Sequence, residues 1–359
     1  MRTPRAGRRC IAGWAALLLT LVAPLAVADC VGLPQPLQPL QPLAPGVWWL
    51  PSAVGDSSAD NRGLVSNLVL VRQGQGAAAR LWAVGSGPSP AMGRALACQV
   101  QRQLGGRVTD VISPWARPEL VLGVAGLRQA QAPQPSGQPP GQPTPPQPAL
   151  RHWAHASVAA AMAVQCPHCV ERMRLRLGPA AADLGADPIS LPDHLLQGEQ
   201  GQLGPFAWWR LPRSDGRWLT VWRLGLPGQP VLWLAPGLLQ GEGPPDGRDA
   251  DLAMLQHASQ RLVALAAADG ATAVFIGEQG PLLAAEAPAQ HAAYWAGLLA
   301  TAEAAVLRGD DELAPAPAWP GLPPAWASQL WHALNWQRAW RQVEAAVLAA
   351  PPEPAASSR

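Results

Sequence analysis

The order of apolar segments repeats once along the chain, and this repetition restricts the fold more than any other feature. Each half contains short apolar runs typical of strands, together with longer runs that have helical spacing. The expected strands lie near residues 46–50, 63–71, 79–84, 108–112, 207–211, 217–224, 230–235 and 272–276. The expected helices lie near residues 89–104, 155–177, 249–268, 286–309 and 325–349. Two sets of strands with helices between them predict an α/β sandwich, in which helices cover two central mixed sheets.

Proline-rich tracts separate these segments. Residues 33–45 repeat Gln-Pro-Leu three times and cannot form a helix or a central strand. Residues 129–148 consist almost wholly of Gln, Pro, Gly, Ser and Ala, so we expect a disordered surface insertion there. A third such stretch, residues 315–324, precedes the last expected helix. A length of 359 residues allows two domains, and the tract at 129–148 either links two domains or interrupts one.

The N-terminus has the three parts of a secretory signal peptide. Four arginines precede an apolar run at residues 11–28, which ends in a small-x-small cleavage site at Ala26-Val27-Ala28. We therefore expect residues 1–28 to be removed and the mature protein to be periplasmic or secreted. The apolar run is also just long enough to span a bilayer, so an uncleaved anchor is the alternative. No other stretch is apolar enough, so we expect no membrane span after cleavage.

Four cysteines, Cys30, Cys98, Cys166 and Cys169, remain after cleavage. In an oxidising compartment they predict two disulfides, with three connectivities open. The segment Cys166-Pro-His-Cys169 spells the active motif of periplasmic thiol oxidases. It continues a helix-like run, however, whereas the redox motif follows a strand and opens a helix. This context favours a structural disulfide over a redox site.

The composition excludes several classes of function. All 26 basic residues are Arg, so neither a P-loop lysine nor a Schiff-base lysine exists. A net charge of +2, with only 14% charged residues, argues against a nucleic-acid binder. No Gly-x-Ser-x-Gly elbow or His-Glu-x-x-His helix is present, and nothing in the sequence supplies a base for Ser113. Seventeen Trp residues predict a large apolar core.

Several segments together resemble the metallo-β-lactamase-fold hydrolases. Residues 43–51 and 61–71, followed by the Gly-x-Ser-x-x-x-Gly turn at 87–93, resemble the start of that fold. The segment at 331–344, together with the Cys pair, resembles the quinoprotein relay system zinc metallohydrolases. The resemblance covers most of residues 43–345. It implies an αββα sandwich at residues 29–310, interrupted by the insertion at 129–148, and a C-terminal helical extension at 311–359.

The resemblance also implies where zinc would bind, and the ligands are missing there. The family's His-x-His-x-Asp-His motif falls on residues 111–123. Its His positions fall on Trp115, Arg117 and Leu120, and its Asp position falls on Glu119. An indole N–H has no lone pair, a Leu has no donor atom, and an Arg stays cationic. We therefore expect no metal and no catalytic residue at this motif.

The later ligand positions have changed as well. The family's bridging carboxylate falls on Gly237, and its last His falls at or beside Glu278. Two carboxylates alone make a poor zinc site. The guanidinium of Arg117 could instead pair with Glu119 and Glu278. The alternative is that both Glu residues lie on surface loops.

These observations predict an exported metallo-β-lactamase-fold protein that has lost zinc binding and hydrolysis. We expect it to need no cofactor. Its role would be that of a binding or accessory protein. The resemblance implies periplasmic quinoprotein dehydrogenases or c-type cytochromes as partners. The first alternative is an active zinc hydrolase with non-standard ligands. A weaker alternative is a thiol–disulfide protein that works through Cys166 and Cys169.

Overall fold

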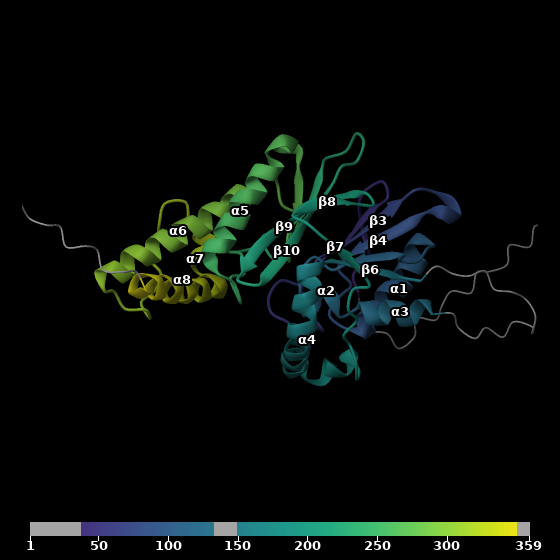
Figure 1. Cartoon of the computed structure of the whole chain (residues 1–359), viewed down its shortest axis with the longest axis horizontal. Coiled ribbons are helices and arrows are strands. Elements are labelled where there is room, and N and C mark those ends of the chain that lie inside the picture. Colours follow the sequence, from purple (N-terminus) through teal and green to yellow (C-terminus); the bar gives the residue numbers. More distant parts are fainter. Residues whose placement is uncertain (1–36, 133–148, 350–359) are drawn as a thin grey trace, which may run out of the picture.

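Two β-sheets packed face to face, with helices on both outer sides, form the framework of the protein (Figure 1). The computed structural model describes residues 37–132 and 149–349. The strands of the first sheet all precede residue 197, and those of the second sheet all follow it. The expected α/β sandwich of two halves is therefore confirmed.

The first sheet has seven strands, which follow one another in chain order. Neighbouring strands run antiparallel from β1 to β4 and parallel from β4 to β7. The strands are β1 (Gln41–Ala44), β2 (Val47–Leu50), β3 (Leu68–Gln73), β4 (Arg80–Val84), β5 (Asp110–Ile112), β6 (Arg151–His155) and β7 (His194–Leu196).

The second sheet has five strands in the order β12-β11-β10-β9-β8. All its pairs are antiparallel except β11 with β12, so this sheet is also mixed. The strands are β8 (Gln200–Leu203), β9 (Phe206–Ser214), β10 (Arg217–Leu224), β11 (Leu232–Leu234) and β12 (Val274–Ile276).

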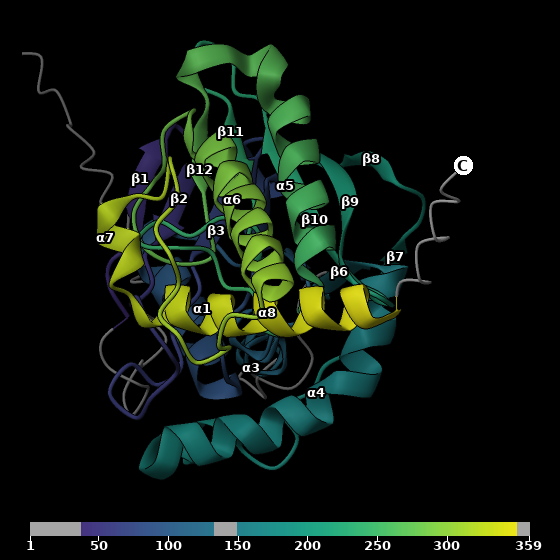
Figure 2. The same cartoon turned by 90° about the vertical axis from the view of Figure 1, so that its left-hand side faces the viewer.

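Helices cover the outer face of each sheet (Figures 1 and 2). The first half carries α1 (Pro90–Leu104), α2 (Pro118–Val121), α3 (Val124–Gln131) and α4 (Ala156–Leu177), and the second half carries α5 (Leu252–Ala266), α6 (Ala287–Arg308), α7 (Pro324–Ala327) and α8 (Leu330–Ala349). Three short 3-10 turns, η1 (Gly76–Ala78), η2 (Gly178–Leu184) and η3 (Ala267–Thr272), complete the described elements. Helix α8 lies across α5 and α6, as Figure 2 shows.

Side-chain alternation along the strands produces three apolar layers. In β3, Leu68 and Leu70 pack against the helices of the first half, whereas Val69 and Val71 pack between the sheets. Successive side chains of a strand point to opposite faces, so a continuous apolar run fills two cores at once. A third core joins the second sheet to α5, α6 and α8. The tryptophans of the C-terminal segment contribute to it, since Trp336 and Trp340 are both buried.

Local signals set the start and end of helix α1. The side chain of Ser89 accepts a hydrogen bond from the amide of Met92, and Pro90 occupies the first turn. Gly105 ends the helix in the left-handed conformation, with φ 62°. Gly93 allows close packing, because a Cβ there would lie 1.9 Å from the carbonyl oxygen of Gly123.

All the expected helices and strands are present in the described residues, and several elements were not expected. Strands β6, β7 and β8 and helices α2 and α3 had no prediction. Helix α3 continues to Gln131, so the start of the insertion at 129 was placed too early. Strand β1 lies within the Pro-rich segment, at the edge of its sheet, where Pro is tolerated. The predicted signal peptide and most of the insertion lie outside the described residues.

No helix among the described residues is long and apolar enough to cross a bilayer.

Candidate functional site

The loop after β5 carries the side chains on which the site is built. Trp115 forms an isolated antiparallel bridge with Leu219 of β10. The carbonyl of Pro114 accepts hydrogen bonds from the amide (2.8 Å) and the hydroxyl (2.9 Å) of Thr220. These contacts hold a loop of the first half against the second sheet. Helix α2 begins directly after Arg117, which is therefore fixed where the two halves meet and is only 8% exposed.

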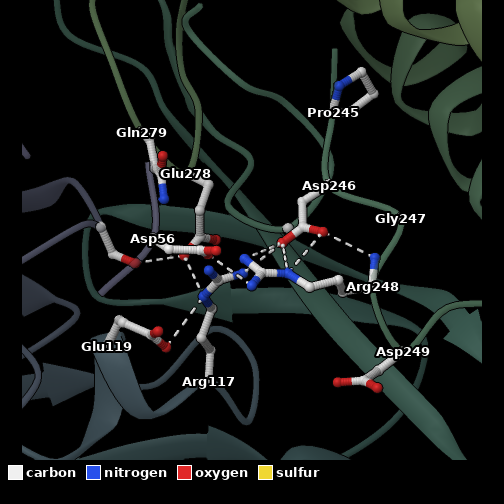
Figure 3. A network of polar contacts seen from close by, with 12 residues as sticks. Asp56, Arg117, Glu119, Pro245, Asp246, Gly247, Arg248, Asp249, Glu278 and Gln279 are labelled. Atoms are coloured by element: carbon white, nitrogen blue, oxygen red, sulfur yellow. Dashed lines mark hydrogen bonds and ion pairs between the residues drawn. The ribbon is translucent and has the colours of Figure 1, made fainter. Parts of the chain in front are cut away.

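The guanidinium of Arg117 lies among three carboxylates (Figure 3). Its Nε is 3.2 Å from Oε2 of Glu119 and 3.4 Å from Oε1 of Glu278. Its Nη1 is 3.2 Å from Oδ2 of Asp246. Glu119 and Glu278 are each 3% exposed. One buried cation thus joins acids from three distant segments of the chain, and removing it would leave buried negative charge without compensation.

The remaining oxygens of the two glutamates also have partners. The hydroxyl of Ser57 donates to Oε1 of Glu119 at 2.8 Å, and that of Ser66 donates to Oε1 of Glu278 at 2.5 Å. The indole Nε1 of Trp115 donates to Oε2 of Glu278 at 3.1 Å. Buried carboxylate oxygens are costly without such donors. The acids are therefore fixed as hydrogen-bond acceptors inside the protein.

Two further arginines complete the cluster. Arg248 contacts Asp246 through Nε and Nη2, both 2.9 Å from Oδ2, and its Nη1 donates to Asp56 at 2.7 Å. Arg213 is 2% exposed and donates to backbone carbonyls, including that of Gly237 at 2.6 Å. Figure 3 shows Arg117 and Arg248 side by side beneath Asp246. We call these residues the arginine cluster: Asp56, Arg117, Glu119, Arg213, Asp246, Arg248 and Glu278.

The charges in the cluster reinforce one another. Burial acts to lower the pKa of Arg117, but the three carboxylates outweigh burial and hold that pKa above its usual value. Burial acts to raise the pKa of Asp246, but Arg117 and a second arginine hold it well below its usual range. Burial and the nearby positive charge of Arg117 lower the pKa of Arg213 to about 10. All three groups therefore remain charged at neutral pH.

Five of the six positions that the sequence resemblance assigns to zinc ligands lie together in this region. They are Trp115, Arg117, Glu119, Gly237 and Glu278. Gly237 packs so closely on Trp115 that a Cβ there would lie 3.2 Å from the indole ring. Leu120 does not join them, because its side chain is buried in the core of the first half and its carbonyl accepts the amide of Ser86.

The predicted pairing of Arg117 with Glu119 and Glu278 is confirmed. The alternative, in which both glutamates lie on surface loops, is wrong, since both are buried. Asp246, Arg213 and the two serines were not predicted from sequence. Asp246 lies in a Gly- and Pro-rich segment, residues 241–249, that reads as an ordinary turn. Only the tertiary fold brings it to Arg117.

The donors at this place do not fit a zinc ion. Zinc in proteins is held mostly by imidazole and thiolate ligands, whereas the cluster offers carboxylates that already accept hydrogen bonds from Arg, Ser and Trp. The guanidinium of Arg117 stands between these carboxylates and would repel a dication. Among residues 37–132 and 149–349, no three His, Cys, Asp or Glu side chains are grouped so that they could hold a metal ion.

The two cysteines of α4 are free thiols, so the disulfide expected at this pair is wrong. They stand in the middle of a continuous helix, where side chains three residues apart are held farther apart than the Cβ atoms of a disulfide. Cys166 is fully buried, and burial together with Cys169 raises the pKa of Cys166 to about 12. Cys98 is disulfide-bonded. Cys30 lies outside the described residues, so its pairing stays a prediction.

Ser113 has a basic partner that the sequence did not reveal. Its hydroxyl lies 2.7 Å from Nε2 of His152. Both residues have no exposed surface. Burial lowers the pKa of His152 to about 4. A substrate cannot reach this pair, which is therefore a packing contact between β5 and β6.

A cavity of about 770 Å³ opens beside the arginine cluster. Its walls come from α4, from the loop that carries Arg117, from the start of β10, and from α8. It is therefore formed by both halves of the molecule. Trp115, Arg117 and Glu119 line it directly, so it gives access to part of the arginine cluster from outside.

The sequence matches no known protein family, and no curated protein is significantly similar to it. Solved structures are similar in fold. A metallo-β-lactamase from Pontibacter korlensis superposes with a TM-score of 0.50 and 12% sequence identity, covering 72% of this chain and 98% of that chain. The chain has the metallo-β-lactamase fold. At this identity the likeness shows the fold alone.

Two further structures are similar at slightly lower scores. The metallo-β-lactamase FIM-1 from Pseudomonas aeruginosa, in a mono-zinc form, is 18% identical over 73% of this chain and 98% of its own, with a TM-score of 0.49. A metallo-β-lactamase from Hirschia baltica is 12% identical over 72% of this chain and 98% of its own, with a TM-score of 0.49.

Proposed function

We propose that this chain is an exported metallo-β-lactamase-fold protein that has lost zinc-dependent hydrolysis and acts as a binding or accessory protein. One observation carries the proposal. The buried guanidinium of Arg117, with Glu119, Glu278 and Asp246 around it, supplies positive charge at a position that the sequence resemblance assigns to a zinc ligand. The carboxylates are thereby compensated without a metal.

Loss of hydrolysis follows from the same arrangement. A zinc hydrolase needs an open metal position at which a bound water becomes a nucleophile. Here the carboxylate oxygens already accept from Arg117, Ser57, Ser66 and Trp115. None of these groups can generate a nucleophilic water at neutral pH. The fold, the cavity and the internal hydrogen bonds of the clustered carboxylates together favour binding over catalysis.

Metal analysis of the mature protein tests this proposal. The protein is purified from the periplasm of a host grown with added zinc and dialysed without chelator, and its zinc is measured by mass spectrometry. We expect much less than one zinc per chain and no hydrolysis of a chromogenic β-lactam. One zinc per chain, together with hydrolysis that a chelator abolishes, would support the alternative of a hydrolase with non-standard ligands.

A thiol–disulfide function has less support. Cys166 is buried and its pKa is raised, whereas a redox cysteine needs an accessible thiolate. Thiol titration of the native protein separates the two cases. Slow reaction of both α4 thiols fits a structural role, whereas rapid reaction or a readily reducible disulfide would revive the redox alternative.

The link to quinoprotein dehydrogenases or c-type cytochromes rests on the sequence resemblance at residues 331–344. Trp336 and Trp340 of that segment are buried in the core, so they are not available for docking. The proposal is tested by elution of a tagged protein from the periplasm of its own cells. Haem absorbance that elutes with the tagged protein, and not with an untagged control, supports a cytochrome partner.

A further inference from the structure

The cavity beside the arginine cluster is unusually rich in positive charge. Seven arginines line it, against three carboxylates. The arginines are Arg117, Arg172, Arg176, Arg213, Arg217, Arg248 and Arg338. Most of the protein carries few charges, with only 14% charged residues overall. The concentration of arginines in one cavity therefore needs an explanation beyond average composition.

The inner arginines are already committed to partners within the protein. Arg117 and Arg248 pair with carboxylates of the cluster, and Arg213 donates to three backbone carbonyls. Glu119, one of the three lining acids, is likewise paired with Arg117. These groups hold the wall of the cavity in place and leave little net charge for a ligand.

The outer arginines are not compensated in this way. Arg176 on α4 and Arg338 on α8 make no hydrogen bond or ion pair with any of the residues that the structure describes. Arg172 reaches only the sulfur of Cys169, at 3.4 Å. Arg217 donates to the carbonyl of Asp249 at 3.2 Å and lies 4.0 Å from its carboxylate, which is 59% exposed. Glu171 also lines the cavity. Among the described residues, Asp249 is the one acid within ion-pair distance of any of these four guanidinium groups.

Two buried guanidinium atoms in the walls lack a hydrogen-bond acceptor. They are Nη1 of Arg338 and Nε of Arg213, and the Arg213 residue as a whole is 98% buried. Both arginines line the cavity, and a buried N–H without a partner is costly. A small shift of either side chain toward an anionic oxygen in the cavity would therefore be favourable.

Part of the remaining lining is apolar. The indole rings of Trp115 and Trp218 and the side chains of Met173 and Ala161 face the same space. Arg210 stacks over Trp218 at 4.0 Å from the ring centroid, which fixes that ring. A volume of about 770 Å³ accommodates a ligand of drug-like size. An inorganic ion would leave the aromatic surfaces unused.

We infer that this cavity binds a small organic polyanion, in which a ring-bearing apolar body carries two or more carboxylate or phosphate groups. The body packs against Trp115 and Trp218, and the anionic groups pair with the outer arginines. Arg forks match carboxylate and phosphate oxygens in a bidentate manner. This inference names the ligand class for the proposed binding role and rests on that role.

Isothermal titration calorimetry tests the inference on the full mature protein. Benzene-1,3,5-tricarboxylate and phenylphosphonate are the anionic probes, and benzene-1,3,5-trimethanol is the uncharged probe of similar shape. We expect at least one anionic probe to bind with one-to-one stoichiometry and to weaken several-fold when NaCl rises from 20 to 300 mM. The stronger of the two probes identifies the anionic group. Failure of both anions at millimolar concentration, or equal binding of the triol, overturns the inference.

Matched variants locate the site. Arg176→Gln and Arg338→Gln are expected to weaken the anionic probe by about tenfold each, the effect of losing one charge-assisted contact. Arg174→Gln on α4 and Arg341→Gln on α8 are the controls, because neither residue lines the cavity. Arg176 is exposed, so its variant keeps the fold. Equal losses in variants and controls would contradict the site.

The measurement also separates this inference from the proposed function. The titrations are carried out on protein treated with chelator, and zinc is measured before treatment. Binding of the probe to a protein that contained one zinc would overturn the proposed loss of metal and leave the anion site in place. Zinc-free protein that binds neither anion would overturn the anion site alone.

Discussion

Arg117 shows how a single buried cation can organise three acids from distant segments of the chain. A guanidinium carries one positive charge, whereas three carboxylates surround it. Arg248 supplies a second charge through Asp246. The hydrogen bonds from serine and tryptophan stabilise the charged form of the acids still further. The arrangement is therefore stable only while each partner is present.

Replacing Arg117 by Ala is expected to lower the free energy of unfolding by about 3–5 kcal/mol at pH 7.5, because buried carboxylates lose their counter-charge. Urea denaturation followed by tryptophan fluorescence measures the change. Without the guanidinium, the pKa values of the folded carboxylates rise above their unfolded values. A carboxyl whose pKa is higher in the folded than in the unfolded protein stabilises the fold at pH values below its unfolded pKa. That stabilisation is lost as the pH rises through the folded pKa. The deficit should therefore be smaller at pH 5 than at pH 7.5.

Arg308→Ala is the control for this experiment. Arg308 pairs with Asp310, and both side chains are exposed, so its loss should cost less than about 1 kcal/mol. A change below about 0.5 kcal/mol for Arg117→Ala would contradict the buried cluster. A deficit that stays constant between pH 5 and pH 7.5 would show that the lost stability has another origin.

The residues of the site were only partly predictable from sequence. Arg117 and Glu119 lie two positions apart in the sequence, so they had to be near each other. The resemblance to the metallo-β-lactamase-fold hydrolases predicted that Glu278 would lie beside them. Asp246 has no aligned role, and it reaches Arg117 only through the path of the loop between β11 and α5. Ser113 and His152 meet because β5 and β6 are neighbours, and β6 itself was not predicted.

At the scale of elements, close backbone contact between α1 and α3 organises the first half. A Cβ on Gly126 would lie 1.8 Å from the carbonyl oxygen of Pro90, and a Cβ on Gly93 would lie 1.9 Å from that of Gly123. The two helices therefore approach at backbone distance on both sides. This approach fixes α2, which precedes α3, and so fixes the position of Arg117 at its start.

Gly126→Ala is expected to lower the free energy of unfolding by about 3 kcal/mol, because the added methyl forces the helices apart. Thermal and urea denaturation measure the loss. The control is Gly106→Ala, where the nearest atom to a new Cβ lies 3.9 Å away and the change should stay within about 0.5 kcal/mol. If both variants are equally stable, the helices are not held at backbone contact.

The elements that sequence reasoning missed have a common physical cause. Strand β6 contains Arg151, His152 and Trp153, which do not form an apolar pattern. Its polar side chains are satisfied from outside the strand: Arg151 and Trp153 both contact the buried carboxylate of Asp110 on β5. Periodicity detects strands such as β3 and β10 whose faces are apolar, and it does not detect a strand stabilised by partners elsewhere in the chain.

At the scale of the whole molecule, the two halves share the apolar layer between the sheets and the polar contacts of the arginine cluster. The layer between the sheets draws its side chains from both sheets, with Trp82 and Val84 on one side and Phe206 and Trp222 on the other. The arginine cluster ties loops of the first half to loops of the second. We therefore treat unfolding as a single transition to which buried groups of both halves contribute.

Four buried histidines with lowered pKa values make that transition depend on pH, and two of them, one in each half, are shifted to about 4. The Nε2 of His291 accepts from the amide of Gln240 and its Nδ1 faces the carbonyl of Ala287, so the ring is neutral. Burial lowers the pKa of His152 and of His291 to about 4 each. An unfolded histidine has a pKa near 6.5. Unfolding therefore takes up protons between pH 6.5 and pH 4, and stability falls as pH falls through that window.

Each of His152 and His291 should contribute up to about 1.4 kcal/mol per pH unit to the slope, and roughly 3 kcal/mol across the window. Urea denaturation at half-unit steps from pH 7 to pH 4.5 measures it. His291→Gln should reduce the slope by about one proton, whereas His257→Gln, on the exposed face of α5, should leave it unchanged. An unchanged slope in His291→Gln would mean that this ring already binds a proton in the folded protein. Two separate transitions, of which only one changes its slope in His291→Gln, would show that the halves unfold independently and that the shared core does not couple them.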